Sequence, residues 1–244
     1  MNSESSLFNF FDKSYIINLP ERSDRRKEIT QELKKIGISD SLAQVKFFPA
    51  IKPTDKGEFP SIGARGCFLS HLEVLKEAKS QNLNNLLIME DDLAFTKLLI
   101  GQQNAVTSEL QRLNWDFAYL GHGVNLAFNG KFFFQEYSEP ILLAHFLAIN
   151  QQIIVQLIDF LEEILKRPSG HPKGGPMHVD GAYSTFRKHN PSAITLIANP
   201  SLGFQKFSPS NIAGYKWFDT LPVSAQLVTA VRKAKTWYRR AYET

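Results

Sequence analysis

Apolar positions along the chain occur as short runs separated by segments with helical spacing. The run from Ser14 to Leu19 is apolar and ends at Pro20, a pattern typical of a buried strand. Ser23 or Asp24 is then placed to cap a helix that ends at Gly37. Further strands are predicted at 45–48, 86–89 and 117–120, and an extended segment at 141–149.

Helical spacing fills the intervals between these runs. Phe68, Leu72 and Leu75 recur one turn apart, a polar helical segment is expected from the acidic turn at 90–92 to Leu113, and 153–165 forms one apolar stripe that Pro168 closes. The segment 49–61 is expected to be irregular, and 168–176 to be a surface connection or a mobile lid. Strands that alternate with helices predict an α/β fold with a mixed, mainly parallel sheet flanked by helices.

Composition narrows the class of protein. A chain of 244 residues is long enough for one domain, expected at 1–221 and followed by a basic, aromatic helix at 222–244. The single cysteine favours a reducing compartment, and no secretion signal or membrane span is expected. A formal net charge of +4 without a concentrated basic face does not suggest nucleic acid. We therefore expect a cytoplasmic protein.

Three consecutive carboxylates, Glu90, Asp91 and Asp92, follow the apolar run 86–89 directly. In an extended chain residues two apart point the same way, so Glu90 and Asp92 are expected on one side and Asp91 on the other. Their mutual repulsion raises the pKa of at least one acid unless a cation is near, and carboxylate oxygens suit Mg²⁺ or Mn²⁺. The alternative is that the acids cap the next helix or are solvated. The abrupt step from apolar to acidic residues favours a metal at Glu90 and Asp92.

Several short segments occur in an order that is typical of one enzyme family. They are Ile17 to Leu19 with Arg22 and Asp24 to Arg26; Gly66 to Leu72; Ile88 to Asp92; Trp115 to Phe117 with Tyr119 to Gly121; Val179 to Ala182; and Gln205 with Ser210 to Ile212. Each motif alone is weak, but their order and spacing make the set specific. Together they resemble glycosyltransferase family 25, the lipooligosaccharide and collagen sugar-transferase group.

The resemblance implies a GT-A-like, Rossmann-type fold. It also implies transfer of a sugar, commonly galactose, from a UDP-sugar to a saccharide or glycolipid acceptor with inversion at the anomeric carbon. Asp92, with Glu90 or Asp91, would lie at the metal, Mn²⁺ or Mg²⁺, and at the donor diphosphate. Gln205 is expected to face the acceptor. His178, two residues before Asp180, is a candidate for the acceptor or the metal site, and the alternative is a loop histidine with neither role. The donor-binding residues expected on this basis are Asn18, Leu19, Arg25, Ser70, His71, Glu90, Asp91 and Gly121.

Inversion requires a base that takes the proton of the acceptor hydroxyl. Asp180 is the first candidate, because it follows the loop at 168–176 and precedes Gly181; the alternative is that it caps a helix. Asp116 is the second candidate, although its position is more typical of a residue that fixes the start of a strand. Asp180 and Asp92 are therefore the predicted catalytic residues.

Cationic and imidazole side chains near these motifs have two interpretations each. Arg25 is expected to contact the diphosphate, whereas Arg26 fits a solvated helix face better. His71 is either a hydrogen-bonded core residue or a neighbour of the donor. His122 is a candidate for the sugar site, and Cys67 is expected to be a small buried filler.

The chain also departs from the family's pattern. Asn211 stands where the family tends to have an acidic residue, His145-Phe146 replaces an Ala-Tyr pair, and Gln151-Gln152 replaces small residues. These changes bear on acceptor identity and on activity. Two other functions stay open: an inactive relative that binds nucleotide or sugar, and a metal-dependent phosphohydrolase, which would need more convergent acids or histidines.

The segment at 222–244 surrounds Trp237 and Tyr238 with basic residues. A basic, aromatic helix suits an anionic membrane surface, and the alternative is a solvated terminal helix. A lipid-linked acceptor would favour peripheral contact with the inner face of the membrane.

Overall fold

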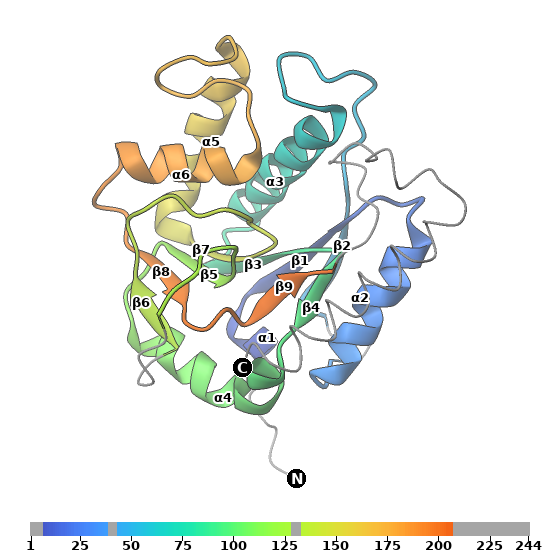
Figure 1. Ribbon diagram of the computed structural model, residues 1–244. Helices are drawn as coiled ribbons and strands as arrows, with labels where there is room; N and C mark the ends of the chain where they lie inside the picture. The colour runs from blue at the N-terminus through green and yellow to red at the C-terminus, as the bar shows by residue number, and fades with distance from the viewer. Residues whose placement is uncertain (1–6, 39–42, 128–132, 207–244) are drawn as a thin grey trace.

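Short apolar runs of the chain form the strands of one mixed sheet (Figure 1). The structure is a computed structural model that describes residues 7–38, 43–127 and 133–206. Its strands are β1 (Lys13–Asn18), β2 (Val45–Pro49), β3 (Asn85–Glu90), β4 (Leu93–Phe95), β5 (Phe117–Gly121), β6 (Phe134–Glu136), β7 (Phe146–Asn150), β8 (Thr195–Ala198) and β9 (Gly203–Gln205).

The sheet has the order β2-β1-β3-β7-β5-β8-β6, and β9 pairs with both β4 and β5 beside this path. β1, β2, β3, β5 and β8 run in one direction, while β7 and β6 run against them. The predicted mixed, mainly parallel sheet is confirmed. Because the parallel strands share a direction, β1, β3 and β5 deliver their carboxyl ends to the same edge.

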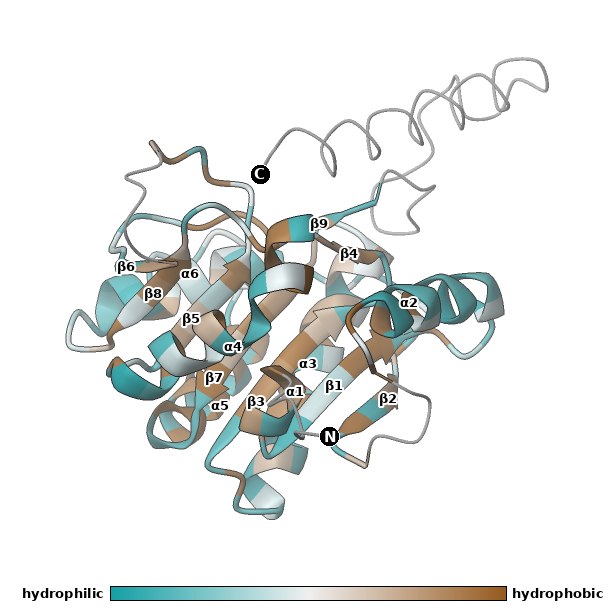
Figure 2. Cartoon of the chain, turned by 90° about the horizontal axis from the view of Figure 1, so that it is seen from below, coloured by the Kyte–Doolittle hydropathy of each residue, from teal (hydrophilic) through white to brown (hydrophobic). Residues whose placement is uncertain are grey.

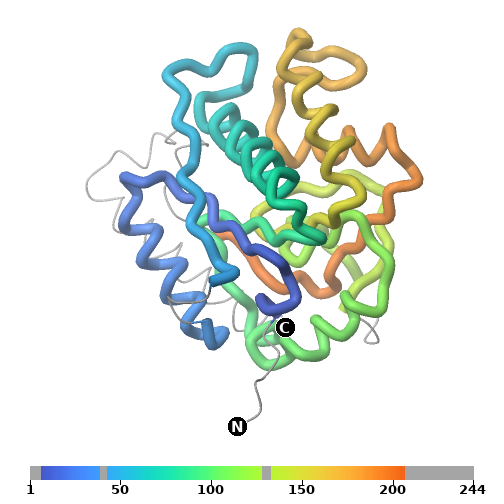
Figure 3. The backbone as a smooth tube through the Cα atoms, turned by 180° about the vertical axis from the view of Figure 1, so that it is seen from behind, coloured from blue at the N-terminus to red at the C-terminus, as the bar shows by residue number. Residues whose placement is uncertain are grey.

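Helices cover both faces of the sheet. They are α1 (Leu7–Phe10), α2 (Ser23–Lys35), α3 (Ile62–Ser80), α4 (Lys97–Arg112), α5 (Gln151–Lys166) and α6 (Val179–His189). Successive strand residues point to opposite faces, so Tyr15 and Ile17 pack with α3, α5 and α6. Ile16, between them, packs with α1, α2 and α4. Figure 3 shows α3 and α5 side by side on the first face, and in Figure 2 the strands are largely brown while α2 is largely teal.

Several predicted elements differ in detail. α2 has Arg22 at its N-cap, without a side-chain cap, so the predicted cap at Ser23 or Asp24 is wrong. Asp24 accepts hydrogen bonds of 2.9 and 2.8 Å from the Arg22 guanidinium. After the acidic turn the chain first forms β4 and only then α4, whose cap is Thr96. Residues 141–145 are not part of a strand, because β7 begins at Phe146.

Three of the sequence-based expectations fall on residues 207–244, outside the described part of the chain. They are the helix at 222–244, its membrane contact and the neutral amide of Asn211. Among the residues that the structure describes, none of the helices combines the length and the apolar character needed to cross a bilayer.

Candidate functional site

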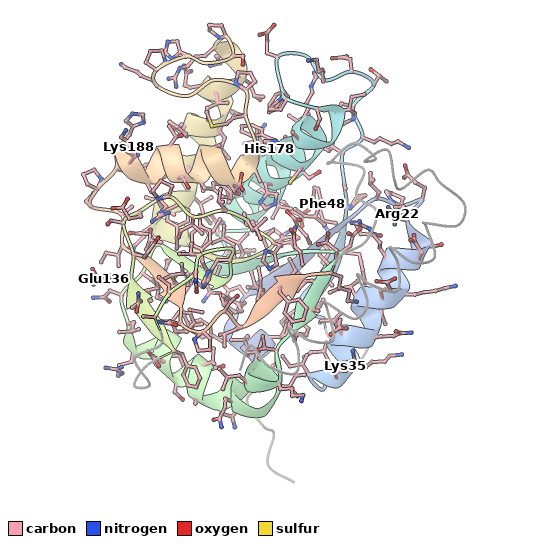
Figure 4. All side chains as sticks on the ribbon, viewed as in Figure 1. Arg22, Lys35, Phe48, Glu136, His178 and Lys188 are labelled. Atoms are coloured by element: carbon pink, nitrogen blue, oxygen red, sulfur yellow. The ribbon has the colours of Figure 1, made fainter. Side chains whose placement is uncertain are left out.

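A cavity of about 1060 Å³ opens at the carboxyl ends of β1 and β3. Ligands of open α/β sheets bind at this edge. Its walls come from the start of α2, the loop at 50–53, the first turns of α3, the acidic turn, the turn after β5, the start of α6 and the segment around β9. Arg22 and His178, both in its lining, are labelled in Figure 4.

The cavity brings together most of the residues predicted from the sequence. Those in its lining are Leu19, Arg25, Ser70, Glu90, Asp91, Asp92, His178, Asp180 and Gln205. Three predicted donor-binding residues lie behind the lining and touch it. Asn18 donates to Asp91, and His71 faces Glu90. Gly121 is packed so tightly that an added Cβ would lie 2.7 Å from His145.

Glu90 and Asp91 have hydrogen-bond partners on different elements, whereas Asp91 and Asp92 both lie near Arg25. Asp91 accepts a hydrogen bond of 2.8 Å from the Asn18 amide and another of 2.8 Å from Arg25 Nη1. Glu90 accepts one of 2.9 Å from Gln205 Nε2 on its Oε2 atom. Asp91 is thereby neutralised by α2, whereas Glu90 is held by β9.

Asp92 has a buried oxygen that the fold leaves unsatisfied. Its Oδ1 atom has no hydrogen-bond partner among the described residues, and its Oδ2 lies 3.5 Å from Arg25 Nη1. Burial raises the pKa of Asp92 to about 8, and the charge of Glu90 adds to the shift. Burial also acts to raise the pKa of Glu90, but contacts with His71 and Gln205 outweigh it and lower that pKa. A divalent cation would satisfy the free oxygen and remove the repulsion, so the donor set fits Mg²⁺ or Mn²⁺.

Asp180 lies in the first turn of α6 and lines the cavity. The N-cap of α6 is His178, so the interpretation of Asp180 as the helix cap is wrong. Its Oδ2 accepts a hydrogen bond of 3.0 Å from the backbone N–H of Leu143, a residue with φ of 70°, and its Oδ1 accepts one of 2.8 Å from Gly181. The carboxylate thus holds the loop before β7 against α6.

The thiol of Cys67 lies beside the acidic turn, with its sulfur 3.6 Å from Glu90 Oε1. Burial raises the pKa of Cys67 well above its usual value, and the charges of Glu90 and Asp180 raise it further. Cys67 packs against the apolar core, as expected of a small filler, but it is only partly buried and also lines the cavity.

Two histidines of the lining are neutral. His122 donates from Nε2 to the Ala198 carbonyl at 2.7 Å and accepts from the Val124 N–H at 3.2 Å, and burial lowers its pKa. His145 is fully buried, with Nε2 3.4 Å from the Gly203 carbonyl, and burial lowers its pKa to about 4. Neither imidazole is placed to supply a positive charge to a phosphate.

Asp116, the second candidate base, lies away from the cavity lining. It accepts from the Gln152 side chain and from the Ile194 N–H, both at 2.7 Å. It therefore ties β5 to α5 and to the segment before β8, as its position at the start of a strand suggested.

Lys206 is the cavity residue that sequence reasoning missed most completely. Its N–H donates to the Asp92 carbonyl at 2.8 Å, and its ammonium lies 3.4 Å from Glu32. The sequence signal for its position was weak. Lys206 directly follows β9, and a strand of three residues is too short to show a period of two.

The sequence profile described as glycosyltransferase family 25 (LPS biosynthesis protein) matches residues 11–158, more than half of the chain. The chain belongs to glycosyltransferase family 25. The matched region contains the acidic turn, α2 and α3, whereas Asp180 and Gln205 follow it.

Relatives within family 25 include enzymes and proteins described as inactive. The chain is 30% identical over 129 residues to procollagen galactosyltransferase 1-B of Xenopus laevis, covering 46% of this chain and 21% of that protein. It is 28% identical over 129 residues to the inactive glycosyltransferase 25 family member 3 of Homo sapiens, covering 46% and 22%. The similarity thus spans about a fifth of these relatives' length.

A solved structure supports the fold. The crystal structure of a glycosyltransferase involved in the glycosylation of the major capsid of PBCV-1 aligns with a TM-score of 0.50 at 9% identity, covering 91% of this chain and 99% of that one. At this identity the likeness concerns the fold alone, and it agrees with the predicted GT-A-like architecture.

Proposed function

We propose that this chain transfers a sugar, with galactose as the first candidate, from a UDP-sugar to a saccharide acceptor in a metal-dependent, inverting reaction. Synthesis of lipooligosaccharide or another surface glycan is the proposed context. The observation that carries the proposal is the unsatisfied Asp92 oxygen beside Glu90, inside a large cavity of a family 25 protein. Names of relatives support galactose, since the matched Xenopus laevis protein is a procollagen galactosyltransferase.

Glu90 and Asp92 would hold Mg²⁺ or Mn²⁺, which when bound neutralises the charge that develops on a departing diphosphate. Asp91 has a supporting task, because its bonds to Asn18 and Arg25 fix the turn on which the other two acids lie. Arg22, Lys52 and Lys206 also line the cavity and would attract the donor phosphates.

Asp180 would accept the proton of the acceptor hydroxyl. Its two backbone hydrogen bonds fix the carboxylate in the cavity wall and leave lone pairs on both oxygens for an acceptor. His178, at the N-cap of the same helix, and Gln205, bonded to Glu90, would contact the acceptor or the donor sugar.

A second candidate function is a non-catalytic relative that binds nucleotide or sugar. Two observations favour it: relatives at comparable identity are described as inactive, and both oxygens of Asp180 already have structural partners. In this case the cavity would bind UDP-sugar without turnover. The phosphohydrolase alternative has less support, because the described residues place no further acids or histidines around Asp92 in a metal-binding group.

Thermal stability tests the binding half of the proposal. A ligand that binds the folded state raises the melting temperature, so UDP and Mn²⁺ together should stabilise the chain more than either alone. Asp92→Ala should remove this difference, while Asp159→Ala, an acid on the exposed face of α5, should retain it. Equal melting temperatures with and without every nucleotide tested would contradict the proposal.

UDP release from UDP-galactose, measured with a panel of saccharide acceptors, separates the enzyme from the inactive relative. If Asp180 is the base, Asp180→Asn should lower the rate by about 10² to 10⁴ while preserving the UDP and Mn²⁺ melting shift. Unchanged release in this variant would exclude Asp180 as the base. Binding without release for any acceptor would support the non-catalytic alternative.

A further inference from the structure

Cys67, His71 and Glu90 form a second cluster at the inner wall of the cavity. Cys67 and His71 are one helical turn apart on α3, so their side chains lie on the same helix face, and Glu90 reaches them from the end of β3. The thiol sulfur is 3.6 Å from Glu90 Oε1, and His71 Nε2 is 3.8 Å from the same oxygen. One atom from each residue lies within 4.8 Å of the other two.

His71 Nε2 has no hydrogen-bond partner among the described residues, although the residue is fully buried. Its other ring nitrogen, Nδ1, lies 3.0 Å from the Tyr183 hydroxyl. This contact fixes the ring and turns Nε2 toward Glu90. An imidazole oriented by a bond to its far nitrogen, with the near nitrogen free, is the usual arrangement of a metal-ligating histidine.

We propose that Cys67 Sγ, His71 Nε2 and Glu90 Oε1 bind a zinc-class divalent cation. Tetrahedral bonds of about 2.0 to 2.3 Å place ligand atoms about 3.3 to 3.6 Å apart, close to the two separations from Glu90 Oε1 seen here. Thiolate and imidazole ligands select zinc over Mg²⁺ and Mn²⁺. Cys67 and Glu90 line the cavity, so the fourth coordination position opens to water.

Binding exchanges one bond for another at the thiol. The sulfur–hydrogen bond of Cys67 breaks, its proton leaves to solvent, and the sulfur electron pair forms the bond to the cation. The cluster uses Oε1 of Glu90, while Oε2 stays on Gln205. A cation there would draw Glu90 away from Asp92 and so oppose binding of Mg²⁺ or Mn²⁺ at Glu90 and Asp92. This competition rests on the proposed function, whereas binding of the zinc-class cation does not.

Cobalt provides a direct probe, because Cys67 is the single cysteine of the chain and a thiolate bound to Co²⁺ produces a charge-transfer absorption band. Titration of the full chain, freed of metal with a chelator, should develop this band to one Co²⁺ per chain. Equimolar Zn²⁺ should displace it and millimolar Mg²⁺ should not. Cys67→Ser should abolish the band. Absence of the band at saturating Co²⁺ would overturn the proposal, whether or not the chain transfers sugar.

Zinc affinity, measured by competition with a chromophoric chelator, assigns the other ligands. His71→Gln and Glu90→Gln should each weaken binding by about tenfold or more. His189→Gln, the same substitution at the exposed end of α6, should leave it unchanged. Circular dichroism checks that each variant folds; should His71→Gln fail this check, Glu90→Gln and Cys67→Ser decide. Zinc affinity equal to wild type in the folded variants would refute the assignment.

Discussion

Asp92 and His145 are ionisable side chains in the cavity wall whose burial favours their neutral forms. The pKa of Asp92 is raised to about 8, and that of His145 is lowered to about 4, in both cases chiefly by burial. Glu90, in the same wall, stays charged because its pKa is lowered. The wall therefore carries less charge than its composition suggests, and a cation that binds Asp92 must displace a proton from it.

His145 makes stability depend on pH in a way that can be isolated. Its folded-state pKa of about 4 lies below the ordinary value of 6.5, so stability is fully present above 6.5 and is lost as pH falls toward 4. Between pH 7 and pH 5 the loss should be about 2 kcal/mol. His145→Gln should remove it.

The measurement is urea unfolding of wild type and His145→Gln at both pH values. Asp92 acts in the opposite direction, because its raised pKa makes the folded state gain relative stability as pH falls from about 8. That contribution is present in both proteins and cancels in their difference. Identical pH responses of the two proteins would show that His145 is charged or solvated in the folded state.

Elements with a clear hydrophobic period were predictable, and short strands were not. β1, α2, β3 and α5 were expected close to where they lie, because each has several consecutive positions that report its period. β4, β6 and β9 have three residues each, and their pairing is decided by distant segments: β9 fits between β4 and β5. Gln205 was placed in the site by family resemblance alone.

The candidate site, like the fold, was predictable only in part. The acidic turn follows from an apolar strand that ends in carboxylates, and Asp180 from the family's pattern. Sequence alone does not show that Asp180 bonds to Leu143, or that Glu90 meets Cys67 and His71, because these contacts join elements far apart in the chain. Distances of this kind depend on how α3 and α6 pack on the sheet.

Gly121, where β5 ends, tests how closely β5, β7 and β9 must approach. A Cβ at this position would lie 2.7 Å from His145 Nε2, 2.9 Å from Phe146 Cβ and 3.0 Å from the Gly203 carbonyl. Gly121→Ala should therefore destabilise the protein by about 1 to 3 kcal/mol and distort the cavity.

The matched control is Gly101→Ala on α4, where a Cβ meets nothing within 4 Å. Alanine favours helices over glycine, so this variant should be neutral or more stable by up to about 1 kcal/mol. Denaturant unfolding measures both. Comparable effects of the two substitutions would mean that the strands at Gly121 can move apart with no loss in the free energy of unfolding.

The region matched by the family 25 profile and the segment that follows it pack into one structure. The profile ends at residue 158, yet the start of α6, the segment 199–201 and β9 also line the cavity. β8 pairs with β5, and Leu196 of β8 is buried in the same apolar cluster as Leu33 of α2. The two regions should therefore unfold together as one domain, consistent with the domain expected from the sequence.

Leu33→Ala and Leu196→Ala test this unity, one substitution in each region. Each removes a buried side chain and should lower the free energy of unfolding by about 2 to 5 kcal/mol within a single transition. Hydrogen exchange under conditions that report global opening should then accelerate in peptides from both α2 and β8, whichever leucine is changed. If each substitution accelerated exchange only in its own region, the two regions would be separate cooperative units. The cavity would then lie between parts able to move independently, because its acidic turn belongs to one region and Asp180 to the other.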